Sequence, residues 1–71
     1  MKVKTDSGII EINKSSKTGK VILGILDTDC FTGRETLNAL IKYAFKLKDI
    51  YNLSYYNAGK LAGNIYAEEI I

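Results

Sequence analysis

The most regular hydrophobic pattern in the chain runs from residue 32 to residue 51. Thr32 and Glu35 have the spacing of a capping box, in which two side chains satisfy free backbone N–H groups at a helix start. Beyond them, apolar side chains recur at three- and four-residue spacing, which places them on one helical face. We predict a long amphipathic helix over residues 32–51, whose inner face consists of Leu37, Leu40, Ile41, Ala44, Leu47 and Tyr51.

The N-terminal segment alternates between polar and apolar side chains, which is the pattern of a half-buried strand. Lys2, Val3 and Lys4 alternate in this way. Asp6-Ser7-Gly8 then supplies residue types that favour a turn, and the alternation resumes after it. We predict a β-hairpin within residues 1–13, with these three residues as its connection.

A continuous apolar run, Val21-Ile22-Leu23-Gly24-Ile25-Leu26, follows a polar loop. Its six residues and its β-branched members favour a strand over a helix. We therefore predict a strand over residues 20–27 that is covered on both faces, since apolar side chains occur at both parities. Helices cover one face, and a second subunit is the simplest cover for the other. This predicts an interface at Ile22, Gly24 and Leu26.

Helical spacing returns near the C-terminus. Asn52 is suited to the left-handed conformation that ends many helices, and Ser54 is suited to the N-cap of the next one. We predict a second helix over residues 54–70, with Ala58, Leu61, Ala62 and Ile65 as its apolar stripe. Because only about three residues join it to the first helix, the two helices form an antiparallel pair.

Together these elements predict a single α+β domain over residues 1–71. Its expected architecture is a three-stranded, mainly antiparallel sheet, made of the hairpin plus the third strand. The antiparallel helix pair follows and packs on one face of that sheet. A domain of this size buries a small core, so self-association is a plausible source of additional stability.

Two glycines, Gly59 and Gly63, lie one turn apart in the predicted second helix. Each costs about 1 kcal/mol relative to alanine inside a helix, so their pairing implies close approach of another backbone or ring. Packing on the first helix is the simpler explanation, and a helix–helix seam with a partner is the functional one. Tyrosine suits interfaces and half-buried rims. The candidate interaction surface of this helix is Tyr55, Tyr56, Gly59, Gly63 and Tyr66.

The residue inventory argues against an enzyme. The chain has no histidine and a single cysteine, Cys30, so the usual general base and the usual zinc ligands are missing. We interpret Cys30 as a small, partly buried thiol. Asp27 and Asp29 are expected to solvate a loop and complement the N-terminus of the next helix, with Mg²⁺ binding as the alternative. We predict no catalytic residue, no metal site, no cofactor and no small-molecule substrate.

The formal net charge of +2 does not by itself indicate nucleic acid, but the basic residues are unevenly placed. The first 20 residues contain five lysines and only two acidic side chains. Lys14, Lys17 and Lys20 are therefore the candidate contacts of an alternative nucleic-acid-binding function. We interpret Lys42, Lys46 and Asp49, on the outer face of the first helix, as an ordinary solvated surface.

The leading hypothesis is a small non-enzymatic interaction or regulatory module. It would act as a homodimer or by binding a larger protein. No stretch approaches the roughly 20 apolar residues of a membrane span, so no membrane partner is expected. The single cysteine fits a reducing compartment, and we predict a cytoplasmic location.

Overall fold

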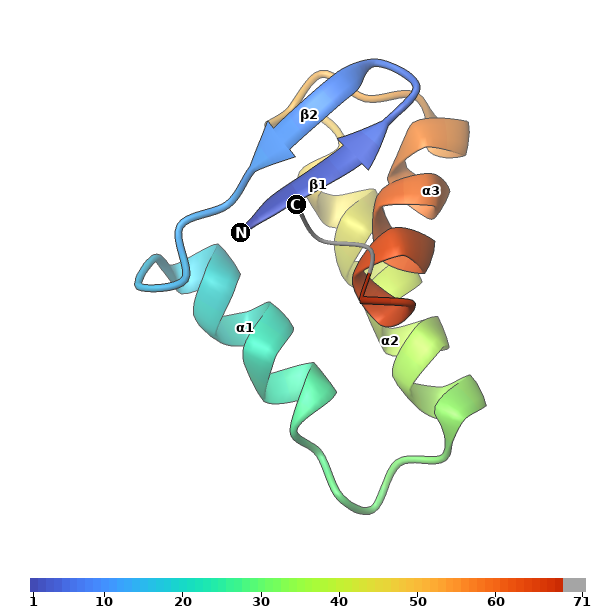
Figure 1. The fold of residues 1–71 in the computed structure, drawn as a ribbon. Coiled ribbons are helices and arrows are strands. Elements are labelled where there is room, and N and C mark those ends of the chain that lie inside the picture. Colours follow the sequence, from blue (N-terminus) through green and yellow to red (C-terminus); the bar gives the residue numbers. More distant parts are fainter. Residues whose placement is uncertain (69–71) are drawn as a thin grey trace.

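A two-stranded antiparallel hairpin lies across one end of three helices in the computed structural model, which describes residues 1–68 (Figure 1). The elements follow one another as β1 (Lys2–Thr5), β2 (Gly8–Glu11), α1 (Lys17–Leu26), α2 (Gly33–Leu47) and α3 (Tyr55–Tyr66). α3 packs on both α2 and β1, and α1 packs against α2.

The predicted hairpin is confirmed, with a shorter connection than expected. Val3 pairs with Ile10, and Thr5 pairs with Gly8, so two residues instead of three join the strands. Gly8 has a φ of 114°, a conformation that glycine adopts without steric cost. The Thr5 hydroxyl tightens the turn by donating to the Gly8 carbonyl at 2.8 Å. One face of the hairpin, which includes Val3, Thr5 and Ile12, is buried.

The predicted third strand is wrong, because residues 20–26 belong to helix α1. Ser16 caps this helix: its hydroxyl accepts a hydrogen bond from the Gly19 N–H at 3.1 Å. Once a helix begins at Lys17, the apolar run that follows is wound into it. Ile22 then faces the core, and Gly24 faces solvent. The fold is therefore a two-stranded antiparallel sheet with three helices, and the expected three-stranded sheet does not form.

Gly19 is required by a close approach between the start of α1 and the preceding loop. A Cβ atom at this position would lie 2.2 Å from the Asn13 carbonyl oxygen and 2.8 Å from Lys14 Cα. The same Asn13 carbonyl accepts from the Ser16 N–H at 3.0 Å and from the Ser16 hydroxyl at 2.6 Å. The loop thus folds back onto the first turn of α1, and only glycine leaves room for it.

The capping box of α2 is confirmed. The Glu35 N–H donates to Thr32 Oγ1, and the Thr32 N–H donates to Glu35 Oε1, both at 3.2 Å. The helix ends at Leu47 instead of residue 51. Asn52 takes a φ of 56°, as predicted, and the Leu53 N–H donates to the Lys48 carbonyl at 2.7 Å. These contacts close the turn before α3.

α3 begins after the predicted N-cap, since the Ser54 hydroxyl accepts from the Asn57 N–H at 3.2 Å. It runs back along α2 (Figure 1) and ends at Tyr66, before the predicted end at residue 70, which lies outside the described residues. Its predicted apolar stripe is buried between α2 and the hairpin. The core consists of Val3, Ile12, Ile22, Leu40, Ala44, Leu47, Leu53, Ala58, Leu61, Ala62 and Ile65.

Within residues 1–68, the helices are too short or too polar for any of them to cross a bilayer.

The two glycines of α1 give a direct test of this helix. We expect Gly19→Ala to lower the free energy of unfolding by about 1–3 kcal/mol, because the new Cβ overlaps backbone that cannot swing away. Gly24→Ala is the matched control. Among the described residues nothing lies within 4 Å of its Cβ position, so it should raise stability by up to about 1 kcal/mol. Urea unfolding measures both, and changes of the same sign would contradict the structure.

Candidate functional site

The rotation of α3 about its own axis is fixed by polar contacts with the hairpin. The buried Asn57 side chain donates from Nδ2 to Ser7 Oγ at 2.8 Å and accepts from the Asp6 N–H at 3.0 Å. Two turns later, Asn64 Nδ2 donates to the Lys4 carbonyl at 2.6 Å. These contacts satisfy backbone groups at the outer edge of β1 and in the turn, and they hold one stripe of α3 against the hairpin. We call these contacts between α3 and the hairpin the polar seam.

An ion pair extends the polar seam at its solvent-exposed edge. Lys60 Nζ lies 3.1 Å from Asp6 Oδ1 and 5.7 Å from the centre of the Tyr56 ring. The hydrogen bond from Lys60 lowers the pKa of the Asp6 carboxyl, and the same bond raises the pKa of Lys60. Both side chains are well exposed, so the pair adds little to the stability of the fold.

Because the stripe of α3 that contains Asn57 and Asn64 is held against the hairpin, four of the predicted interaction residues lie together on the side of α3 that faces away from the core. We call Tyr56, Gly59, Gly63 and Tyr66 the outer face of α3. Tyr56 is 65% exposed and Tyr66 is 40% exposed. Within the described chain, no atom from outside the helix lies within 4 Å of the Cβ position at Gly59 or Gly63. The expectation that these glycines admit the first helix or a ring of the same chain is therefore wrong.

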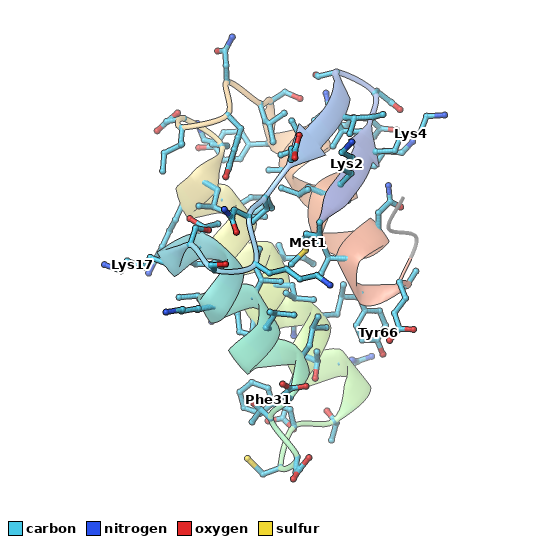
Figure 2. The ribbon with its side chains drawn as sticks, turned by 60° about the vertical axis from the view of Figure 1, so that its left-hand side comes forward. Met1, Lys2, Lys4, Lys17, Phe31 and Tyr66 are labelled. Carbon is cyan, nitrogen blue, oxygen red and sulfur yellow. The ribbon has the colours of Figure 1, made fainter. Side chains whose placement is uncertain are left out.

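Tyr66 marks the end of this face. Its hydroxyl lies against the first turn of α2, where a Cβ at Gly33 would be 2.5 Å away. In Figure 2 Tyr66 extends from the last turn of α3 at the edge of the molecule, well away from Lys17 on α1. The outer face thus runs along α3 from Tyr56 near its start to Tyr66 at its end, with the two glycines between them.

Tyr55 belongs to a different group at the turn between α2 and α3. Its ring meets the Phe45 ring edge-to-face, with centroids 5.5 Å apart and an interplanar angle of 87°. Lys48 Nζ lies 4.7 Å from the centre of the Tyr55 ring. A hydrogen bond to Asp49, 3.0 Å away, raises the pKa of Lys48. We call Phe45, Lys48 and Tyr55 the elbow cluster.

The remaining predicted interaction residues do not converge. Ile22 is buried in the core, Leu26 is half-buried, and Gly24 points into solvent on α1. Their grouping depended on the third strand, and it disappears with that strand.

The three lysines of the nucleic-acid alternative do lie together at the start of α1. Lys17 and Lys20 are exposed and one turn apart, and Lys14 is exposed in the preceding loop. In Figure 2 Lys17 points away from the molecule on the side opposite Lys2 and Lys4, which extend from the hairpin. The basic residues of the N-terminal segment therefore form two separate surfaces.

Asp27, Asp29 and Cys30 lie in the connection between α1 and α2. Cys30 is exposed, which differs from the partly buried thiol that we expected. Nowhere in residues 1–68 do three cysteine or carboxylate side chains come together in a way that could hold a metal ion. The acidic pair thus gains no third ligand from the fold.

Asn57 and Asn64 are the residues that sequence reasoning missed. Asparagine is disfavoured inside helices, and these two are seven residues apart, on one helical face. That spacing was the available signal. Phe45 was also missed, because it interrupts a polar face and has no periodic partner.

The chain matches no protein-family model, no curated protein and no solved structure. Its function is therefore inferred from three surfaces of the chain itself: the outer face of α3, the elbow cluster and the α1 lysines.

The seam between α3 and the hairpin can be tested by removing Asn57. We expect Asn57→Ala to lower the free energy of unfolding by about 1–3 kcal/mol, because it leaves a buried site without its two hydrogen bonds. Asn38→Ala is the control, since Asn38 is exposed on α2, and it should be neutral or slightly stabilising. Equal effects of the two substitutions in denaturant unfolding would refute the seam.

The ion pair makes a second prediction, for pH. Because the folded-state pKa of Asp6 is lowered, its contribution to stability is present above the unfolded pKa and is lost as pH falls through the folded pKa. We expect the carboxyl carbon of Asp6, followed by NMR, to titrate at a lower pH than an ordinary aspartate, because Lys60 lowers its pKa. In Lys60→Gln its midpoint should rise. An unchanged midpoint in that variant would show that Lys60 does not hold the carboxylate.

Proposed function

We propose that the protein is a small non-enzymatic interaction module that self-associates through the outer face of α3. The observation that carries this proposal is the pair of open glycines, Gly59 and Gly63. Each glycine costs a helix interior about 1 kcal/mol relative to alanine. Within the described chain no packed neighbour accounts for that cost at either position. A second helix that approaches this face closely does account for it.

The chemistry of the outer face suits a second copy of the same chain. A homodimer with two-fold symmetry needs a surface that is complementary to itself. This face combines the exposed ring of Tyr56 and the half-exposed ring of Tyr66 with a notch at the two glycines, so the Tyr56 ring of one copy can fill the notch of the other. Tyrosine is enriched at interface cores because it joins a large apolar area to a hydroxyl.

Self-association would also add stability to a domain whose core is small. A chain of 71 residues buries a modest share of its surface. Any partner that binds only the folded state adds stability by mass action. As part of this proposal we place the module in the cytoplasm, where the exposed thiol of Cys30 stays reduced.

A second candidate function is nucleic-acid binding through Lys14, Lys17 and Lys20. The observation in its favour is that these cations share one exposed end of α1, where the helix N-terminus also favours negative charge. Within residues 1–68 none of the three forms an ion pair.

Replacement of both glycines tests the leading proposal. In Gly59→Ala/Gly63→Ala we expect a monomer that is more stable by about 2 kcal/mol, because two helical glycines are removed. The same variant should dimerise at least tenfold more weakly, which corresponds to about 1.4 kcal/mol of lost contact. Analytical ultracentrifugation from micromolar to millimolar concentration measures the dimer, and urea unfolding at low concentration measures the monomer.

Gly24→Ala is the matched control for this experiment. It also places alanine at an open helical glycine, but on α1, so it should stabilise the fold and leave dimerisation unchanged. A parent protein that remains monomeric at every concentration would contradict self-association. Equal dimerisation of the parent and the double variant would remove the outer face of α3 from the proposal.

A further inference from the structure

We propose that the protein carries a binding site for single-stranded nucleic acid, formed by the outer side of α2 and the elbow cluster. This site goes beyond the proposed self-association and lies on other residues. It also differs from the α1 lysines in containing aromatic rings. Two observations lead to it: a basic ridge on α2, and exposed rings held in place at the end of that ridge.

The ridge consists of Arg34, Asn38, Lys42 and Lys46, which follow one another at four-residue intervals on α2. Residues at this spacing form a continuous row on a helix surface. All four are exposed, and they lie opposite the buried side of α2, where Leu40 faces the core. The row runs from residue 34 to residue 46, which is about 18 Å at the rise of an α-helix.

The cations of the ridge are available to an external anion. Across residues 1–68, neither Arg34, Lys42 nor Lys46 takes part in an ion pair. Glu35 is the acidic neighbour on α2, and its carboxylate accepts the Thr32 N–H in the capping box. The row thus carries three positive charges, with the Glu35 carboxylate beside its start and the Asp49 carboxylate paired with Lys48 beyond its end. Phosphate groups are the natural complement of the three cations.

The elbow cluster supplies the second half of the site, one residue from the ridge. Phe45 lies between Lys42 and Lys46 in the sequence and is 40% exposed, and Tyr55 is 67% exposed. Rings this exposed would ordinarily be mobile, but each holds the other edge-to-face, and Lys48 lies against the Tyr55 ring. Rings already held in place lose little conformational entropy when a ligand stacks on them.

Exposed rings beside a row of cations match what single-stranded nucleic acid requires. Successive bases stack on aromatic side chains while the backbone follows a basic groove or surface. In a duplex the base faces are already stacked on one another, so the rings would gain nothing from it. Reading a duplex would instead need polar side chains at the start of a helix in the groove. The start of α3 offers Tyr55 and Tyr56, and its Asn57 is buried against the hairpin.

The α1 lysines lack this combination. Residues 13–26, which form α1 and the loop before it, contain no aromatic side chain. Figure 2 shows Lys17 at the start of α1 and Phe31 beyond the far end of that helix. The two basic surfaces therefore predict different ligand preferences. Only the α2 site is expected to distinguish a single strand from a duplex.

The test is fluorescence anisotropy of the full chain with labelled oligothymidylate, oligouridylate and a duplex of the same length. We expect at least tenfold tighter binding of the single strands than of the duplex, with an affinity that falls as salt rises. In Lys42→Gln/Lys46→Gln the salt slope should fall by about 1.4, which corresponds to two lost phosphate contacts on a single strand.

Substitution of Tyr55 separates stacking from charge. Tyr55→Ala should weaken binding by about five- to a hundredfold, the range of one lost base stack, whereas Tyr55→Phe should retain it. Lys2→Gln/Lys4→Gln, which also removes two exposed lysines but from the hairpin, serves as the matched charge control and should leave single-strand binding unchanged. Lys14→Gln/Lys17→Gln/Lys20→Gln tests the α1 lysines as the competing site. Urea unfolding of each variant confirms that it is folded.

Four outcomes would overturn the proposal. The first is the absence of salt-dependent binding to a single strand, and the second is equal or tighter binding of the duplex. The third is loss of single-strand binding in Lys14→Gln/Lys17→Gln/Lys20→Gln but not in Lys42→Gln/Lys46→Gln. The fourth is equally tight binding of polyglutamate, which would identify an acidic protein surface as the ligand of this site.

Discussion

The polar seam between α3 and the hairpin is the contact on which the rest of the surface depends. Apolar packing alone lets a helix rotate, because many side chains fit a similar groove. Asn57 removes that freedom, since its amide must meet both Ser7 and the backbone of Asp6 at once. The second contact, from Asn64 to the Lys4 carbonyl, fixes the helix two turns further along. With those two points set, Gly59 and Gly63 have to face outward.

The same seam also occupies backbone hydrogen-bonding groups along one edge of the small sheet. Unpaired backbone groups on an edge strand invite pairing with another chain. Along β1, the Lys4 carbonyl is covered by Asn64, and the turn is covered by Asn57. The two asparagines thus hold the hairpin and helix together and direct association away from β1. The proposed self-association uses the outer face of α3 instead.

Much of the fold could be read from local signals, and the one major error has a physical cause. The capping box at Thr32, the left-handed Asn52 and the Ser54 cap each act through neighbouring residues, so the sequence shows them directly. The run from Val21 to Leu26 is compatible with either strand or helix. The helix is favoured by the Ser16 cap and by the fit of Gly19 against the Asn13 carbonyl. That second contact is visible only in three dimensions. The tyrosines and glycines of α3 could be grouped by helical spacing, whereas their exposure depended on how Asn57 docks.

Concentration-dependent NMR tests the central claim, that the outer face of α3 is the self-association surface, most directly. Amide proton–nitrogen spectra of the parent protein should show resonances of Tyr56, Gly59, Gly63 and Tyr66 moving together with concentration, along one binding curve. Amides of the buried seam, such as that of Asn57, should move little. Spectra that do not change with concentration, or changes confined to α1 or to β2, would contradict the account.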